Sequence, residues 1–262
     1  MGFFTTEITS RDLVSDNPIH QRQLYAYYKA LPYIKGNLLE IGCGNGRGYE
    51  MLKEHCETYT AIDKNDTLLS LINEIDKHKV VFFNDFFPPF NNIADASMDC
   101  IVCFQVIEHI DADLTLIKEI HRVLKVGGQA LITTPNRLMS LTRNPWHVRE
   151  YLPAELTDLL KKEFKKVETF GIFGDELVNE YWQKNKESVQ KFTRFDVFNL
   201  QHKLPRALLQ IPYDIANRLN RKSLQKQDNT LVAAIGQHNF SIAAATDACY
   251  DLFAIATKTE LN

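Results

Sequence analysis

Cysteine is scarce in this sequence, and the number of cysteines is odd. Five occur among 262 residues, at positions 43, 56, 100, 103 and 249. Because five cysteines cannot all pair, we expect no disulfide framework and a protein of the reducing cytoplasm. Cys100 and Cys103 form a C-x-x-C pair within "MDCIVCFQ", an apolar stretch typical of a buried strand. Residues three apart on a strand point to opposite faces, so we predict two core residues and no shared metal or redox site.

The sequence also lacks a charge excess, a leader and a long apolar run. Thirty basic and thirty-three acidic residues leave a net charge of −3, which argues against a general nucleic-acid binder. The start, "MGFFTTEITSRD", has no basic segment followed by an apolar one, so no signal peptide is expected. No apolar run reaches the roughly 18 residues that span a bilayer. With 45% hydrophobic residues, the chain can still bury a sizeable core.

What the sequence does have is a regular alternation of short apolar runs and amphipathic stretches. Strands are predicted at seven places, 37–42, 59–63, 79–85, 98–105, 129–135, 166–174 and 250–258. Helices are predicted between or before them, at 17–34, 48–55, 65–76, 113–125 (ended by Gly127 and Gly128) and 153–164. This alternation predicts an α/β fold with a doubly wound, mostly parallel sheet that helices cover on both faces.

One region interrupts the alternation. Within 183–226 there are ten Lys or Arg and three Asp or Glu, a net charge of +7, which leaves about −10 for the rest of the chain. Aromatic and aliphatic side chains are interleaved with these charges. We therefore divide the chain into an N-terminal helical cap (1–35), a core (36–174 with 241–262) and a basic, amphipathic helical insertion (175–240).

A glycine-rich turn follows the first predicted strand, in "LLEIGCGNGRG" (38–48). Glycine permits unusual φ angles and close approach of a ligand, and the following helix presents its N-terminal N–H groups. The dinucleotide pattern G-x-G-x-x-G fails here because position 47 is Arg. The residues present, Glu40, Gly42, Gly44 and Gly46, turn the prediction away from a nicotinamide cofactor.

Acidic residues end the next two predicted strands. Asp63 closes "YTAID", where a carboxylate can accept the hydroxyls of a ribose. Asp85 follows "VVFFN", where a carboxylate can accept an adenine amine. "FQVIEHI" (104–110) follows the fourth strand with a further acid. Because parallel strands end at one edge of the sheet, these groups are expected to meet at a single nucleotide-like site.

In these motifs, together with "EIHRVLKVGGQALITTPN", the sequence resembles the class I S-adenosylmethionine-dependent methyltransferases. The resemblance covers about 36–172 and the last strand, and is closest to the group of ubiquinone-type O-methyltransferases and small-molecule or glycan methyltransferases. It implies a seven-stranded Rossmann-like sheet whose last strand is antiparallel and lies between the fifth and sixth. The implied cofactor is S-adenosyl-L-methionine, with S-adenosyl-L-homocysteine as product.

The resemblance also implies how each motif contacts the cofactor. Asp63, with Lys64 beside it, would hold the ribose; Asp85 and Phe86 would frame the adenine; Gln105 would lie beneath the sulfonium. Cys43 and Asn45 would contribute contacts through their backbone. The methionine part would be surrounded by Glu40 and the turn that follows it, Gly42, Cys43, Gly44, Asn45 and Gly46.

Candidate catalytic residues follow the fourth and fifth strands. His109 and His147 suit proton transfer near neutral pH, and Tyr151 lies close to His147 in sequence. The alternative for His109 is a hydrogen bond that orders its loop, and for His147 a loop position pinned by Trp146 and Tyr151. Glu108 and His109 could share a metal with a third ligand, but no second spaced pair supports this, so no metal site is predicted.

The acceptor is the part of the function on which the sequence says least. His20, Arg22 and Tyr25 of the first helix, with Trp146 and Arg149, are predicted to face it. The basic insertion, which the family topology would make part of a lid, has three interpretations. It is a solvated cap that packs on the domain or a second subunit, a surface that recognises an acidic small molecule or peptide, or a helix that lies peripherally on a membrane to reach a lipid-like acceptor.

We predict transfer of a methyl group to an oxygen of a small molecule or biosynthetic intermediate. N-methylation and methylation of a peptide or glycan stay open, as does a monomer or a homodimer. Two further alternatives are a nucleotide-dependent oxidoreductase, which the failed dinucleotide pattern disfavours, and a non-catalytic methyltransferase-like subunit.

Overall fold

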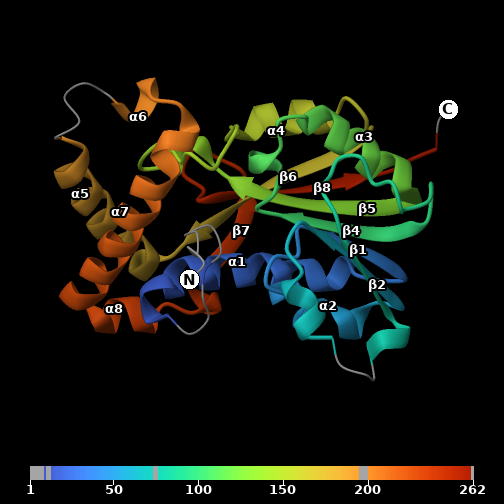
Figure 1. The fold of residues 1–262 in the computed structure, drawn as a ribbon, viewed down its shortest axis with the longest axis horizontal. Helices are drawn as coiled ribbons and strands as arrows, with labels where there is room; N and C mark the ends of the chain where they lie inside the picture. The colour runs from blue at the N-terminus through green and yellow to red at the C-terminus, as the bar shows by residue number, and fades with distance from the viewer. Residues whose placement is uncertain (1–8, 10–12, 73–75, 195–199, 261–262) are drawn as a thin grey trace.

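The computed structural model describes residues 9, 13–72, 76–194 and 200–260, which form one mixed sheet flanked by helices (Figure 1). The strand order is β3-β2-β1-β4-β5-β8-β6-β7. The strands are β1 (Asn37–Ile41), β2 (Thr58–Asp63), β3 (Val80–Asn84), β4 (Met98–Phe104), β5 (Leu124–Pro135), β6 (Lys166–Gly174), β7 (Phe240–Ala244) and β8 (Asp251–Thr257). The predicted α/β class, with a mostly parallel sheet, is confirmed.

The sheet has the predicted strand directions and one strand more than the seven predicted. Strands β3, β2, β1, β4 and β5 run parallel to their neighbours, and β8 lies antiparallel between β5 and β6, as the resemblance implied. An eighth strand, β7, which the sequence did not suggest, pairs antiparallel with β6. Its sequence, "FSIAA", ends in two alanines, a residue type depleted in strands, so little sets it apart from the insertion before it.

Helices cover both faces of the sheet, as Figure 1 shows, and divide the core in two. Helices α1 (Asn17–Ala30) and α2 (Arg47–Leu52) pack on one face; α3 (Asp113–Val123) and α4 (Pro153–Leu160) pack on the other. Cys100 is buried on the α1 side and Cys103 on the α3 side. The prediction that these two cysteines are core residues on opposite faces is therefore confirmed.

Two local predictions were wrong. The helix expected at 65–76 is replaced, among its described residues, by two 3-10 turns; Asn73–Ile75 lie outside the described residues. Gly127 and Gly128 do not end α3, because the helix stops at Val123 and both glycines lie inside β5. The 3-10 turns of the chain are η1 (Val14–Asp16), η2 (Leu31–Tyr33), η3 (Lys53–His55), η4 (Thr67–Ser70), η5 (Asp76–His78), η6 (Ile107–His109), η7 (Arg137–Met139) and η8 (Gln237–Asn239).

The basic insertion is helical and gathers at one end of the sheet (Figure 1). It contains α5 (Glu176–Thr193), α6 (Leu200–Lys203), α7 (Arg206–Gln227) and α8 (Asn229–Ala234). On α7, four aliphatic side chains at spacings of three and four form a stripe that is at least half exposed: Leu208, Ile211, Ile215 and Leu219. No described helix combines the length and apolar character that crossing a membrane requires.

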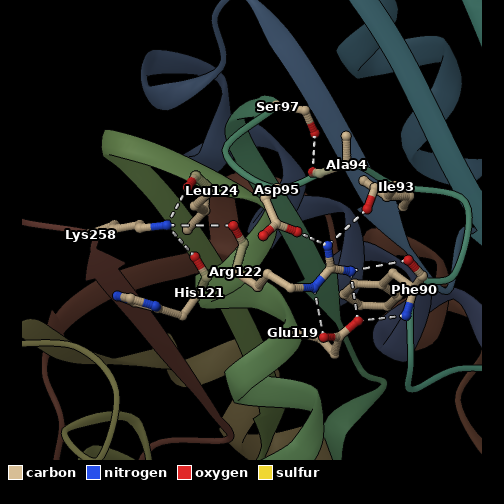
Figure 2. A network of polar contacts seen from close by, with 10 residues as sticks. All are labelled: Phe90, Ile93, Ala94, Asp95, Ser97, Glu119, His121, Arg122, Leu124 and Lys258. Carbon is tan, nitrogen blue, oxygen red and sulfur yellow. Dashed lines mark hydrogen bonds and ion pairs between the residues drawn. The ribbon is translucent and has the colours of Figure 1, made fainter.

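Arg122 on α3 fastens the connection between β3 and β4 (Figure 2). Its guanidinium donates to both carboxylate oxygens of Glu119 at 2.8 Å and to the backbone oxygens of Ile93 (3.0 Å) and Phe90 (3.1 Å). It also pairs with Asp95 at 2.5 Å, and Glu119 in turn accepts from the Phe90 N–H. The segment that begins at the carboxyl end of β3 is thereby tied to a rigid helix.

Replacing Arg122 by Met should lower the free energy of unfolding by about 2 kcal/mol, because carbonyls and a carboxylate lose a charged donor. Urea unfolding with an unchanged m-value measures this loss. Arg137→Met is the matched control, since Arg137 pairs with Glu155 at a more exposed site and should cost at most about 1 kcal/mol. Equal losses in the two variants would contradict the role given to Arg122.

Candidate active site

The glycine turn after β1 adopts the left-handed backbone that its glycines permit. Gly42, Gly44 and Gly46 have φ angles of +73°, +54° and +78°. A Cβ on Gly42 would collide with Val106, and one on Gly46 with Leu71. At Gly44 a Cβ would meet nothing within 4 Å, so the backbone there borders open space. The turn therefore packs tightly on its inner side and leaves room for a ligand at Gly44.

Glu40 lies beneath this turn and is 1% exposed. Its Oε1 accepts a hydrogen bond of 2.7 Å from the Tyr27 hydroxyl of α1, and its Oε2 accepts one from the Tyr59 hydroxyl of β2. Burial is the main cause that raises the pKa of Glu40, and also that of both tyrosines. The structure gives Glu40 a supporting role under the turn; its contact with the cofactor stays a prediction.

Asp63 ends β2 and faces the same turn. Its Oδ2 accepts from the Gly44 N–H at 2.7 Å, and its Oδ1 accepts from the N–H (2.8 Å) and side-chain amide (3.2 Å) of Asn65. A carboxylate has about four acceptor positions, so three internal bonds leave room for a hydroxyl. The geometry fits the predicted ribose contact and holds Asp63 in one orientation.

The other predicted cofactor residues lie along the same sheet edge. The side chains of Asn45 and Lys64 are exposed, and Phe86 is 78% exposed. Asp85, at the end of β3, hydrogen-bonds through its N–H to the Asp63 carbonyl at 3.1 Å. Gln105, after β4, has a φ of +57°, which is uncommon outside glycine and marks a constrained backbone at the sheet edge.

Cys43 is the exception among these residues, because its side chain is buried and only its backbone lies in the turn. Burial raises the pKa of its thiol well above the usual range. Its predicted contribution through the backbone is compatible with this position. Taken together, a glycine turn open at Gly44, an oriented Asp63 and the exposed groups beside them fit a nucleoside carrying an amino-acid tail.

An open cavity of about 1060 Å³, including its solvent-filled mouth, lies next to the carboxyl end of β5. Its wall comes from α1, the loop after β5, and the insertion helices α5 and α7. Many of its side chains are polar, among them Arg22, Asn136, Ser140, Asn144, Asn185 and Arg221. None of the predicted cofactor residues, all of which the structure describes, lines the cavity; it lies on the same edge of the sheet as the glycine turn, at β5, two strands away from β1.

His147 and its partner Glu150 line this cavity. His147 Nδ1 lies 2.6 Å from Glu150 Oε1, and Nε2 lies 2.8 Å from the Asn144 amide nitrogen. His109 stacks edge-on against His147, with ring centroids 4.9 Å apart, and its Nδ1 faces the Trp146 carbonyl at 3.1 Å. The structure therefore brings the two predicted histidines together.

Tyr151 is placed elsewhere. It is fully buried, and its hydroxyl donates to Asp113 at 3.0 Å. Burial, followed by the nearby Asp113 carboxylate, raises the pKa of Tyr151 well above its usual value. The hydroxyl therefore keeps its proton near neutral pH and does not act as a base. The structure thus assigns Tyr151 to the packing between α3 and the loop after β5 and gives it no access to the cavity.

Of the five residues predicted to face the acceptor, one lines the cavity and four lie outside its wall. Arg22 lines the cavity and pairs with buried Asp251 at 2.9 Å. His20 and Tyr25 are buried outside the cavity wall, and Tyr25 packs on Phe240.

The remaining two acceptor candidates lie in the loop after β5. Trp146 contributes its carbonyl to His109, and Arg149 is directed to Asp113 at 3.0 Å. Neither belongs to the cavity wall. Sequence reasoning missed Glu150 and Asn144, although both lie three residues from His147, a spacing that could have suggested partners for its ring.

Known proteins support the assignment of class that this geometry suggests. Residues 39–132 match the methyltransferase domain family. A probable S-adenosylmethionine-dependent methyltransferase of Mycolicibacterium smegmatis is 27% identical over 266 residues, covering 97% of this chain and 94% of the relative. One of Mycobacterium tuberculosis is 32% identical over 177 residues, 64% of either chain.

The fold also has solved counterparts. Phosphoethanolamine N-methyltransferase 2 of Haemonchus contortus, solved with S-adenosyl-L-methionine, matches with a TM-score of 0.54 at 17% identity, over 91% of this chain and 52% of that one. The sheet and site thus define a Rossmann-like methyltransferase. The domain match and the relative that spans nearly the whole chain make this chain a class I S-adenosylmethionine-dependent methyltransferase, with S-adenosyl-L-methionine as its cofactor.

Asp63→Ala should weaken the binding of S-adenosyl-L-homocysteine at least tenfold, because the variant loses the ribose acceptor and the anchor of the Gly44 N–H. Isothermal titration calorimetry measures the affinity. Asp66→Ala, three residues on and exposed, is the matched control and should bind like the wild type. An unchanged affinity in Asp63→Ala would remove the ribose assignment.

Proposed function

We propose that this methyltransferase transfers the methyl group to a hydroxyl oxygen of a small polar molecule held in the cavity beside β5. The observation that carries the proposal is the His147–Glu150 pair in the cavity wall, with 2.6 Å between Nδ1 and Oε1. A hydroxyl must lose a proton when it is methylated, whereas a neutral amine attacks before losing one. A histidine oriented by a carboxylate suits that task.

The cofactor supplies the sulfonium methyl, which is already electrophilic, so the chain needs to align the acceptor, exclude water and take up a proton. The acceptor oxygen forms the new C–O bond as the methyl–sulfur bond breaks, and S-adenosyl-L-homocysteine leaves with the electron pair on sulfur. The proton passes to the His147–Glu150 pair. Helices α5 and α7, which form one wall of the cavity, support the proposal that 175–240 acts as a lid.

The charges of the wall favour a neutral polar acceptor over an acidic one. Arg22 is paired with Asp251, and Arg221 pairs with buried Asp16 at 3.2 Å, so both wall arginines already have carboxylate partners. Arg218 pairs with the same Asp16 at 3.1 Å. Arg218 and Arg221 thus share one carboxylate of the N-terminal cap, so one negative charge faces two of the positive charges counted in the insertion.

Transfer to another atom is the second candidate. Relatives include a ubiquinone biosynthesis O-methyltransferase of Pseudomonas aeruginosa (26% identical over 105 residues) and a thiol S-methyltransferase of Mus musculus (28% over 115 residues). Both matches cover less than half of this chain, 41% for the thiol S-methyltransferase and 38% for the O-methyltransferase. These two relatives support methyl transfer equally and do not distinguish oxygen from sulfur as the acceptor atom. The proposal of an oxygen acceptor therefore rests on the residues of the cavity wall.

His147→Ala should lower kcat about 100-fold or more, the range that general-base catalysis supplies, while leaving cofactor affinity nearly unchanged. Single-turnover kinetics and calorimetry separate the two quantities. His78→Ala, an exposed histidine before β3, is the matched control and should keep full activity. Full activity in His147→Ala would strike this residue from the mechanism.

The acceptor class is tested by a screen of alcohols, carboxylates, amines and thiols, read out as S-adenosyl-L-homocysteine release. Turnover confined to hydroxyl compounds is the expected result. Turnover with amines or thiols and none with hydroxyl compounds would overturn O-methylation.

A further inference from the structure

Three potential metal ligands converge between the cofactor edge and the cavity. Glu108 and His109 come from η6 after β4, and His147 comes from the loop after β5. One ligand atom from each lies within 4.8 Å of those of the other two. The sequence offered only the adjacent pair Glu108 and His109; the fold adds His147 from 38 positions further along the chain.

The backbone holds these two loops together. The Glu108 carbonyl accepts the N–H of Val148 at 2.7 Å and that of Arg149 at 3.3 Å. Its side chain is 1% exposed, and its Oε2 accepts from the Thr134 hydroxyl of β5 at 3.0 Å. The backbone of Glu108 is therefore tied to the loop after β5, and its buried carboxylate is held by Thr134.

The outer partners of both histidines define which ring nitrogen can accept. His109 Nδ1 faces the Trp146 carbonyl, which only accepts, so Nδ1 carries the hydrogen and Nε2 the lone pair. His147 Nδ1 faces the Glu150 carboxylate with the same consequence. This is the arrangement by which metal-binding histidines are oriented in proteins: the distal ring N–H donates to a carbonyl or a carboxylate.

The Asn144 amide beside His147 Nε2 is oriented as well. Its Oδ1 accepts from the Trp146 N–H at 3.0 Å, which turns its NH2 toward Nε2 at 2.8 Å. Nε2 is therefore an acceptor in this structure. Binding an ion through Nε2 displaces the Asn144 amide and requires no change of tautomer.

We propose that Glu108, His109 and His147 form a binding site for one divalent transition-metal ion beside the acceptor cavity. Two imidazoles and one carboxylate suit such ions and leave coordination positions open. Three ligand atoms that each lie about 2.0–2.2 Å from one ion are about 3.0–3.6 Å from each other, so ligand pairs at the 4.8 Å limit must close by about 1 Å when the ion binds.

The ion deepens the proposed function and rests on it for its catalytic role. An acceptor hydroxyl that reaches the open positions is acidified by coordination, as zinc-bound water is acidified to a pKa of about 7. Its O–H bond breaks, and because His147 Nε2 is then bound to the ion, the proton passes to the other member of the His147–Glu150 pair, Glu150, which lines the same cavity. The metal-bound alkoxide then forms the C–O bond while the methyl–sulfur bond of the cofactor breaks. The ion neither gains nor loses electrons.

Co²⁺ is the probe, because its visible d–d absorption reports its ligands without any acceptor or turnover. The tag-free, metal-stripped chain should bind one Co²⁺, with visible bands and a calorimetric affinity. His109→Gln keeps a donor for the Trp146 carbonyl and Glu108→Gln keeps the shape of the carboxylate; each should weaken Co²⁺ binding at least tenfold, while circular dichroism stays unchanged. His78→Gln is the matched control and should bind as the wild type does.

Failure is visible in two ways. A folded wild-type chain that binds no Co²⁺ at millimolar concentration overturns the site, as does equal binding by the wild type, His109→Gln and Glu108→Gln. Methylation of hydroxyl compounds by a chain that binds no Co²⁺ would leave the proposed function standing without the ion. Co²⁺ binding that both variants lose establishes the site, whichever acceptor class the enzyme methylates.

Discussion

The buried carboxylate of Glu40 is the interaction on which the cofactor edge depends. It accepts hydrogen bonds from the hydroxyls of Tyr27 on α1 and Tyr59 on β2. Glu40, on β1, therefore links the N-terminal cap to the first two strands. A Cβ at Gly48, in the first turn of α2, would collide with both Glu40 and Tyr27. Since a buried acceptor that loses its donor costs about 1–3 kcal/mol, each tyrosine has a large influence on the turn above it.

From that point the strand ends set the positions of everything else. Asp63 and the Gly44 N–H are joined across β1 and β2, Gln105 ends β4, and the loop after β5 carries His147. Each group is local to its own strand, and the parallel register places them side by side. The cavity lies at the carboxyl end of β5 itself, where the insertion helices α5 and α7 complete its wall. The cofactor region and the acceptor cavity thus both lie along the edge of the sheet formed by the carboxyl ends of its parallel strands.

The parts of this arrangement that the sequence could predict are those encoded locally. Glycines at every second position after an apolar run, and acids that end strands, identify the cofactor edge without any knowledge of distant contacts. The contact of His147 with His109 could not be read in this way, since it depends on how the loops after β4 and β5 meet, whereas the spacing of three residues could have suggested Glu150. Tyr151 shows the converse: its type and position suggested chemistry, but its hydroxyl is used to anchor Asp113. Strand β7 was missed because only its pairing with β6 makes it a strand.

The support that Glu40 gives to the cofactor turn can be measured directly. Tyr27→Phe removes one of its two hydroxyl donors, whereas Tyr28→Phe alters the neighbouring side chain, which is 56% exposed. Calorimetric titration with S-adenosyl-L-homocysteine, at a temperature where both variants are folded, should show about tenfold weaker binding for Tyr27→Phe, equivalent to about 1.4 kcal/mol, and no change for Tyr28→Phe. Wild-type affinity in Tyr27→Phe would contradict the account.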